Sequence, residues 1–320
     1  MAQDKAAGLW LEIGRARAEH AIRQQLALLP RFLAARAARR GEPRAQAQTL
    51  LGTPPEVLLK QLSADATASE ALLLYGDSWL KYEGCPAHSS SNMAEELTDR
   101  GFTVYDRAAF SGARVLDLAK PGNIDRLARE YRRAVADKRV PKAFILCGGG
   151  NDAVGNGRFY DLLNDADSGT RGLNDAAVTQ RVDGDIQAAY LSILGSIDRL
   201  GRQFFPGHAI PVLVHGYDFP VPDSRSACHL VGPWLGPHLT NRGYTEPKEC
   251  RQIARALIER LNAMQDRLRA LSGLDVKHIS LTGTLSTQEA DYREAWENEL
   301  HPTPPGFGRI TDVFLQKAGL

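Results

Sequence analysis

The chain has 320 residues, of which 39 are Lys or Arg and 38 are Asp or Glu, for a net charge of +1. This length is enough for one large α/β domain with an extension, and the near-neutral charge gives no reason to expect binding to nucleic acid. No apolar run reaches the ~20 residues of a membrane span, and the N-terminus has no signal-peptide pattern. We therefore expect a cytoplasmic protein without a transmembrane segment. The four cysteines form no Cys-x-x-Cys pair, and we predict no disulfide.

The first 68 residues have the pattern of helices that lie outside the main domain. Apolar residues recur at helical spacing from Leu11 to Leu33, with arginines between them, and Thr53 is the expected cap of a further short helix. We therefore divide the chain into an N-terminal helical extension (1–68) and an α/β domain (69–320). The basic helix face has two interpretations, a solvated surface or a contact with a membrane or anionic partner. The extension is also a candidate for a homo-oligomer contact or for narrowing a substrate pocket.

From about residue 69 onward, short apolar strands alternate with helices. We expect strands at Ala71–Tyr75, Phe102–Tyr105, Ala143–Cys147, Ile210–Val214 and Val276–Leu281. We expect helices at about Ser91–Arg100, Ile124–Lys138, Asp183–Phe204 and Pro247–Leu271, with a last helix after Gly308. This alternation is typical of a parallel sheet with helices on both faces, in which ligands bind beyond the carboxyl ends of the strands. Two segments, about 155–174 and 218–245, are too long for simple connections, and we expect functional loops there.

Four residues with complementary chemistry lie where such a site would form. Ser78 follows the first expected strand, Gly112 the second and Asn151 the third, and His301 precedes the last helix. A serine hydroxyl attacks a carbonyl carbon once a base takes its proton, and histidine is the base best suited to neutral pH. The N–H groups of Ser78 and Gly112 and the side-chain amide of Asn151 would stabilise the oxyanion that forms. The pattern predicts a serine hydrolase site.

These residues stand in motifs that resemble the SGNH or GDSL hydrolase family. Gly76-Asp77-Ser78 matches the first family block, Gly112 fits the second, Gly149–Asp152 matches the third, and His301-Pro302 matches the last. The resemblance covers residues 69–320 in the correct order. It implies a flavodoxin-like three-layer α/β/α sandwich around a parallel five-stranded sheet. It also implies hydrolysis of carboxylic esters of sugars, lipids or small alcohols, without a cofactor.

Two residues depart from the family pattern. Trp79 stands where the family's namesake motif has Leu, at a position that we expect to pack. The family usually has Asp three residues before the histidine, where it orients the imidazole and stabilises its charged form, and here that residue is Asn298. The amide oxygen of Asn298 can accept the imidazole N–H bond but cannot supply a negative charge. Glu297, Glu299 or Asp291 could supply the charge instead, or a Ser–His dyad could use a backbone carbonyl as the orienting group. The sequence leaves these alternatives open.

Further residues are candidates for the substrate pocket or for structural roles near it. The pocket candidates are Trp79, His215, Tyr217 and Trp234. Because aromatic side chains also form small hydrophobic clusters under loops, that interpretation stands beside the pocket. We expect Asp77 to bond its own turn and Asp152 to cap the turn after the third strand. We expect no metal, because Cys85, His88, Cys228 and His229 lack the spacing of a four-ligand zinc site.

The leading hypothesis is ester hydrolysis through an acyl-enzyme on Ser78, with a small-molecule, glycan or lipid ester as the partner. Two other functions use the same residues or the same fold. The acyl group could pass to a sugar or alcohol instead of water, which would make the protein an acyltransferase. Alternatively, the chain could be a non-catalytic ligand-binding member of the fold, an interpretation that Asn298 favours because it removes the usual charge.

Overall fold

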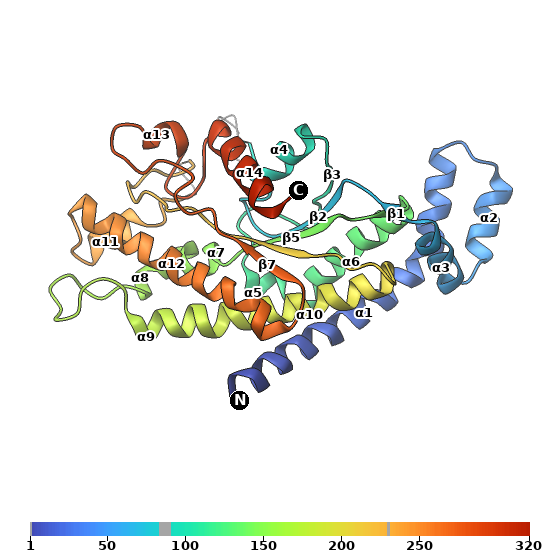
Figure 1. Ribbon diagram of the computed structural model, residues 1–320, viewed down its shortest axis with the longest axis horizontal. Coiled ribbons are helices and arrows are strands. Elements are labelled where there is room, and N and C mark those ends of the chain that lie inside the picture. The colour runs from blue at the N-terminus through green and yellow to red at the C-terminus, as the bar shows by residue number, and fades with distance from the viewer. Residues whose placement is uncertain (1, 83–90, 229–230) are drawn as a thin grey trace.

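The computed structural model describes residues 2–82, 91–228 and 231–320, and a parallel five-stranded sheet lies at its centre (Figure 1). In sheet order the strands are β3 (Thr103–Tyr105), β2 (Ala71–Tyr75), β5 (Ala143–Cys147), β6 (Val212–His215) and β7 (Val276–Ile279). Numbered along the chain, this order is 2-1-3-4-5, the flavodoxin-like order of a doubly wound sheet. A small parallel pair, β1 (Thr67–Ala68) and β4 (Arg139–Val140), lies beside it. The structure confirms the predicted fold class.

Helices cover both faces of the sheet and give the domain three layers (Figure 1). One face carries α4 (Met93–Asp99) and α14 (Pro304–Ala318), and the other carries α6 (Pro121–Ala136), α10 (Gln187–Phe204) and α12 (Pro247–Ser272). The other helices are α1 (Ala2–Arg39), α2 (Arg44–Gly52), α3 (Pro55–Asp65), α5 (Val115–Leu118), α7 (Gly150–Val154), η1 (Gly155–Gly157), α8 (Arg158–Asp161), α9 (Asp175–Val178), the π-helix η2 (Thr179–Ile186), α11 (Gly236–Asn241) and α13 (Tyr292–Ala295). Because both faces are covered, the carboxyl edge of the strands is the place left for a ligand.

Helix α1 runs along the outer side of α10 and α6 and forms an additional layer (Figure 1). Two glycines allow this close approach. A Cβ atom on Gly14 would lie 1.8 Å from the carbonyl oxygen of Ser192, and one on Gly195 would lie 2.1 Å from the carbonyl oxygen of Leu11. The two helices therefore touch backbone to backbone. Although α1 shares the apolar core of the α/β domain, the domain boundary at residue 68 stays a prediction.

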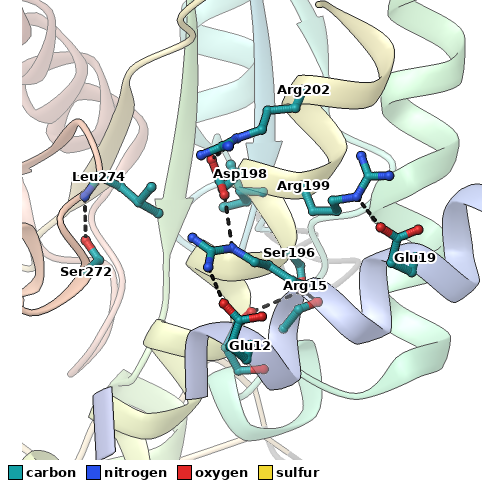
Figure 2. A network of polar contacts seen from close by, with 12 residues as sticks. Glu12, Arg15, Glu19, Ser196, Asp198, Arg199, Arg202, Ser272 and Leu274 are labelled. Carbon is teal, nitrogen blue, oxygen red and sulfur yellow. Dashed lines mark hydrogen bonds and ion pairs between the residues drawn. The ribbon is translucent and has the colours of Figure 1, made fainter. Parts of the chain in front are cut away.

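Polar side chains border the contact between α1 and α10 (Figure 2). Arg15 donates to Asp198 at 3.2 Å, and Arg202 donates to the same carboxylate at 2.8 Å. The Ser196 hydroxyl donates to the carbonyl oxygen of Gly14 at 2.8 Å. Because the two arginines are partly exposed, their ion pairs contribute little to stability. The buried apolar residues of α1 and the close backbone contact therefore hold this helix in place.

Two helix starts differ from the sequence prediction. Thr53 does not cap α3: its hydroxyl bonds back into α2, and Pro54 occupies the cap position without a side-chain bond. The last helix starts at Pro304, before the expected start after Gly308. Thr303 accepts the N–H of Gly306 there at 3.2 Å, and prolines are tolerated in the first turn because its N–H groups have no partner within the helix.

The cysteines correct a further expectation. Cys228 is disulfide-bonded, although we predicted no disulfide. Pairing depends on proximity in space, which the spacing of cysteines along the chain does not reveal. Cys85, His88 and His229, considered above as metal ligands, lie outside the described residues. Within the described part of the chain, none of the helices combines the length and apolarity needed to cross a membrane. Disulfides persist mainly in oxidising compartments, so this bond does not support the cytoplasmic location, which stays a prediction.

The α1–α10 contact predicts that replacing two glycines of α10 by alanine has opposite effects on the free energy of unfolding. Gly195→Ala places a methyl group against the backbone of α1, and we expect it to lower the free energy of unfolding by about 1–3 kcal/mol. A Cβ atom on Gly201 would meet no atom within 4 Å, so Gly201→Ala is expected to raise the free energy of unfolding by about 0.5–1 kcal/mol. Urea denaturation of both variants measures the difference. Equal effects of the two substitutions would contradict the backbone contact.

Candidate active site

Strand β2 ends in a turn that carries Ser78. A Cβ atom on Gly76 would lie 2.3 Å from the carbonyl oxygen of Cys147, so glycine is needed where the end of β2 touches the end of β5. The next residue, Asp77, is buried and accepts the N–H of Trp79 at 3.0 Å, which is the bond within its own turn that we expected. Ser78 then lies at the rim of the sheet, only 6% exposed.

The Asp77 carboxylate also joins neighbouring strands. The Tyr217 hydroxyl, beyond the end of β6, donates to one of its oxygens, and the Cys147 thiol at the end of β5 lies 3.5 Å from the other. Burial raises the pKa of Asp77, and these donors act in the opposite direction. Tyr217 in turn accepts the N–H of Gly150 at 3.3 Å. The serine turn and the loop after β5 are thus linked through one tyrosine.

His301 reaches Ser78 from the segment before α14, 223 residues further along the chain. The Ser78 Oγ and His301 Nε2 atoms are 2.8 Å apart, and His301 Nδ1 lies 3.0 Å from Asn298 Oδ1. The structure therefore brings Ser78, His301 and Asn298 together in one hydrogen-bonded chain. This is the arrangement of a nucleophile, a base and an orienting group.

The hydrogen bonds of Asn298 decide the tautomer of His301. The Oδ1 atom of Asn298 accepts the backbone N–H groups of Leu300 and His301, each at 3.0 Å, and its Nδ2 atom donates to the Tyr82 hydroxyl at 3.3 Å. The amide oxygen therefore faces the imidazole, and His301 carries its proton on Nδ1. The Nε2 lone pair is left to accept the Ser78 hydroxyl. Burial lowers the pKa of His301 to about 3, so the imidazole is neutral at ordinary pH.

Glu299 supports the site by holding a distant loop. Its carboxylate is fully buried and accepts four backbone N–H groups at 2.6–2.9 Å, those of Ser224, Trp234, Leu235 and Gly236. Burial raises the pKa of Glu299, and the four donors act in the opposite direction. Because both of its oxygens bind this loop, Glu299 has a structural role here. Asp291 likewise bonds the Ser286 hydroxyl, and the side chain that contacts His301 Nδ1 is Asn298.

The loop after β5 carries the expected amide donor. Gly149 has φ of 99°, a conformation that favours glycine, and the short helix α7 follows it. Asn151 Nδ2 donates to the carbonyl oxygen of Ala113 at 3.1 Å, which places the amide beside the segment that contains Gly112. The sequence predicted that Asp152 caps the turn after β5. Its carboxylate instead accepts the N–H group of Val115 at 2.8 Å, at the start of α5.

A cavity of about 50 Å³ opens beside these groups. Ser78, Asn151 and His301 form its polar side. Its apolar side comes mainly from α12, α7 and the loop after β6, with Ala254, Leu257, Ile258, Leu261, Val154 and Leu235. Gly112 is not part of this wall, and neither is any described residue of the N-terminal helices. Three of the four residues singled out in the sequence, Ser78, Asn151 and His301, thus lie around one cavity.

The four pocket candidates separate into two groups. Trp79 and Tyr217 line the cavity. Trp234 lies outside the wall, with its ring centroid 5.6 Å from that of His301 in an edge arrangement. His215 is fully buried below the site and packs on the Phe314 ring at 5.4 Å. Burial lowers the pKa of His215 to about 3. His215 is therefore a core residue, because β6 extends one residue beyond the predicted end at Val214 and includes His215, which pairs with Cys147 in the sheet.

Comparison with known proteins gives a likeness in fold. Neither a protein-family model nor a curated protein matches the sequence. Among solved structures, the chain is similar to a GDSL-like lipase from Parabacteroides merdae, with 15% identity, a TM-score of 0.40, and coverage of 78% of this chain and 95% of that one. It is also similar to an acetylxylan esterase from Geobacillus stearothermophilus (15% identity, TM-score 0.40, coverage 80% and 97%) and a carbohydrate acetylesterase from Sinorhizobium meliloti (14%, 0.41, 78% and 99%).

The chain resembles the SGNH hydrolases. That resemblance rests on the four sequence motifs and on the strand order of the sheet. Two features of the site carry no sequence signal of their own. Tyr82 stacks on His301, with ring centroids 4.1 Å apart, but the two residues are far apart in the chain. The apolar face of α12 has the ordinary pattern of a core helix.

The low pKa of His301 predicts a loss of stability in acid. In the unfolded chain the histidine pKa is near 6.5, whereas in the folded protein it is about 3. Above pH 6.5 both states are neutral, and below it only the unfolded state binds the proton, so stability falls as the pH drops toward 3. Between pH 7 and 5 we expect a loss of about 2 kcal/mol from this residue.

Urea denaturation at pH 7 and pH 5 measures this loss in the parent and in His301→Gln, which removes the titrating group. The parent should lose about 2 kcal/mol more than the variant between the two pH values. Because His215 is present in both proteins, its contribution cancels. The same pH dependence in both proteins would show that His301 is accessible to protons in the folded state.

Proposed function

We propose that the protein is a serine hydrolase that cleaves carboxylic esters with short acyl groups through an acyl-enzyme on Ser78. The observation that carries this proposal is the chain of hydrogen bonds from Ser78 to His301 to Asn298 at the wall of a cavity. A turn serine without a catalytic role needs no buried neutral imidazole 2.8 Å from its hydroxyl. The arrangement fits general-base activation of an alcohol nucleophile.

Each group has a defined step in this reaction. Neutral His301 accepts the Ser78 proton at Nε2 while Oγ attacks the ester carbonyl carbon, and the resulting imidazolium then protonates the departing alcohol. Water repeats the sequence to release the acid. The N–H of Ser78 and the Asn151 amide are the proposed oxyanion donors, with the N–H of Gly112 as a third. An amide has two N–H donors, so Asn151 can keep its bond to Ala113 and still donate to the oxyanion.

The size and lining of the cavity support a short acyl group. A volume of about 50 Å³ has room for roughly three to five water-sized groups. An acetyl or propionyl group fits this space, and a hexanoyl chain exceeds it. The apolar side chains of α12 and Leu235 would surround the alkyl part of the acyl group, away from water. The alcohol part of the ester would then lie toward the opening.

Two other functions remain candidates and have separate tests. Acyl transfer to a sugar or alcohol uses the same acyl-enzyme, and it would yield an acylated glycan when an acceptor is supplied. A non-catalytic ligand-binding protein would have no activated serine. Fluorophosphonate probes react only with activated serines, so labelling separates this possibility from both enzyme functions.

The proposed roles of Ser78 and Asn151 predict two different losses of activity. The parent should react with a fluorophosphonate probe and hydrolyse p-nitrophenyl acetate, and Ser78→Ala should lose labelling and lower kcat by a factor on the order of 10⁴. Asn151→Ala should keep labelling but lower kcat by about 10²–10³. Asn241→Ala, a change of an exposed asparagine, is the control and should match the parent. Equal turnover by Ser78→Ala and the parent would exclude the proposed mechanism.

The cavity also predicts the preference for acyl length. With p-nitrophenyl esters, kcat/KM should fall steeply from acetate and propionate to hexanoate in the parent. Leu257→Ala, which shortens a wall residue, should raise the hexanoate-to-acetate ratio about 10-fold or more, because one or two methylene groups in a pocket change specificity by ~10–200-fold. Leu268→Ala removes a buried leucine of α12 outside the cavity, and it should leave the ratio unchanged. If both variants change the ratio equally, the cavity is not the acyl site.

A further inference from the structure

The proposed reaction creates a charge for which the orienting residue offers no counter-charge. When His301 takes the Ser78 proton, the imidazole becomes a cation in a buried position. Burial disfavours that charged form. In a Ser-His-Asp triad the carboxylate stabilises the imidazolium, but Asn298 is a neutral amide. Some other group near the ring must reduce the cost of the charge if the reaction is to proceed.

Tyr82 is in contact with the whole face of the His301 ring. The two ring centroids are 4.1 Å apart and the planes differ by 8°, so the rings are stacked in parallel. Tyr82 is 6% exposed. The negative face of an aromatic ring attracts a cation within about 6 Å of its centroid, most strongly where water is excluded. The Tyr82 ring lies within this distance of the imidazole, and its burial excludes water.

The structure around Tyr82 holds this ring in place. Tyr82 lies four residues after Ser78, and its backbone carbonyl accepts the Asn92 amide at 3.2 Å at the start of α4. Its hydroxyl accepts the Nδ2–H of Asn298 at 3.3 Å. The Trp234 ring also lies near the imidazole, in a T-shaped arrangement with 5.6 Å between the ring centroids. The imidazole therefore has two aromatic neighbours, of which Tyr82 is the stacked one.

The phenol of Tyr82 is neutral and does not act as an anion. Burial, and secondarily the charge of Glu297, raises the pKa of Tyr82 to about 12. Among the described residues, the groups near His301 include the Ser78 hydroxyl, the Asn298 amide and the rings of Tyr82 and Trp234. The Glu297 carboxylate is close enough to Tyr82 to raise its pKa. Of these groups, the Tyr82 ring is the one stacked on the imidazole, and its negative face suits an imidazolium.

We propose that Tyr82 is a positioning residue whose ring face stabilises the protonated form of His301 and so takes over part of the role that a carboxylate has in a Ser-His-Asp triad. This inference rests on the proposed function, because it concerns the imidazolium formed during ester cleavage. It predicts that the ring matters more than the hydroxyl. It also predicts that a carboxylate at position 298 makes the ring less important.

The first test compares Tyr82→Phe with Tyr82→Leu in the parent and in an Asn298→Asp background. Tyr82→Phe keeps the ring and should change kcat by less than about 3-fold, whereas Tyr82→Leu should lower kcat roughly 5- to 30-fold with little change in KM. In the Asn298→Asp background, the loss caused by Tyr82→Leu should shrink to less than about 3-fold. An equal loss in both backgrounds would mean that Tyr82 only packs against the site, and would overturn the inference.

A second test keeps the shape of the side chain constant. Phenylalanine analogues with increasing ring fluorination at position 82 weaken the negative ring face without removing the stacked ring. We expect kcat to fall stepwise with fluorine number relative to Tyr82→Phe, while thermal unfolding stays the same. A kcat independent of fluorination would overturn the inference. Fluorophosphonate labelling of the parent keeps the two proposals apart: a parent that does not react refutes the proposed function itself, whereas a reactive parent with unaffected Tyr82 variants refutes only this inference.

Discussion

The buried carboxylate of Asp77 is the interaction on which the geometry of the site depends. It joins the ends of three adjacent strands, since it accepts the Trp79 N–H after β2, contacts the Cys147 thiol at the end of β5 and accepts the Tyr217 hydroxyl after β6. These strands surround the point where the strand order of the sheet reverses, which is where doubly wound sheets bind ligands. Through Gly150, Tyr217 extends the connection to the loop that carries Asn151. The serine and its proposed oxyanion donor are therefore positioned by one buried group.

The base is set up differently from the serine. His301 lies in a water-poor environment that keeps it neutral, and its ring is held by an amide at one edge and by Tyr82 on one face. A carboxylate in place of Asn298 would add a further buried ionisable group to the site, and burying a charge is costly unless it is fully paired. The amide avoids that cost in the resting protein. The demand for charge stabilisation then arises only when the imidazole is protonated, during the reaction.

Much of this could be predicted from the sequence, because the signals are local. The apolar run from Ala71 to Tyr75 marks β2 with its observed bounds, and its position before Ser78 predicts the serine turn. The starts of helices were less predictable, since capping at Thr53 competed with the two prolines that follow it. Tyr82 and the disulfide of Cys228 could not be predicted, because each depends on residues brought together by the tertiary fold. Local patterns reveal which residues reach the rim, and long-range packing decides what surrounds them.

The four hydrogen bonds to Glu299 tie the rim of the pocket to the base. Glu299 lies two residues before His301, and it binds the loop segment that includes Trp234 and Leu235. An exchange of this loop for one of another length, as in the engineering of new substrate ranges, would leave a buried carboxylate without donors two residues from the base. Successful loop grafts will have to retain these backbone amides or replace Glu299 at the same time.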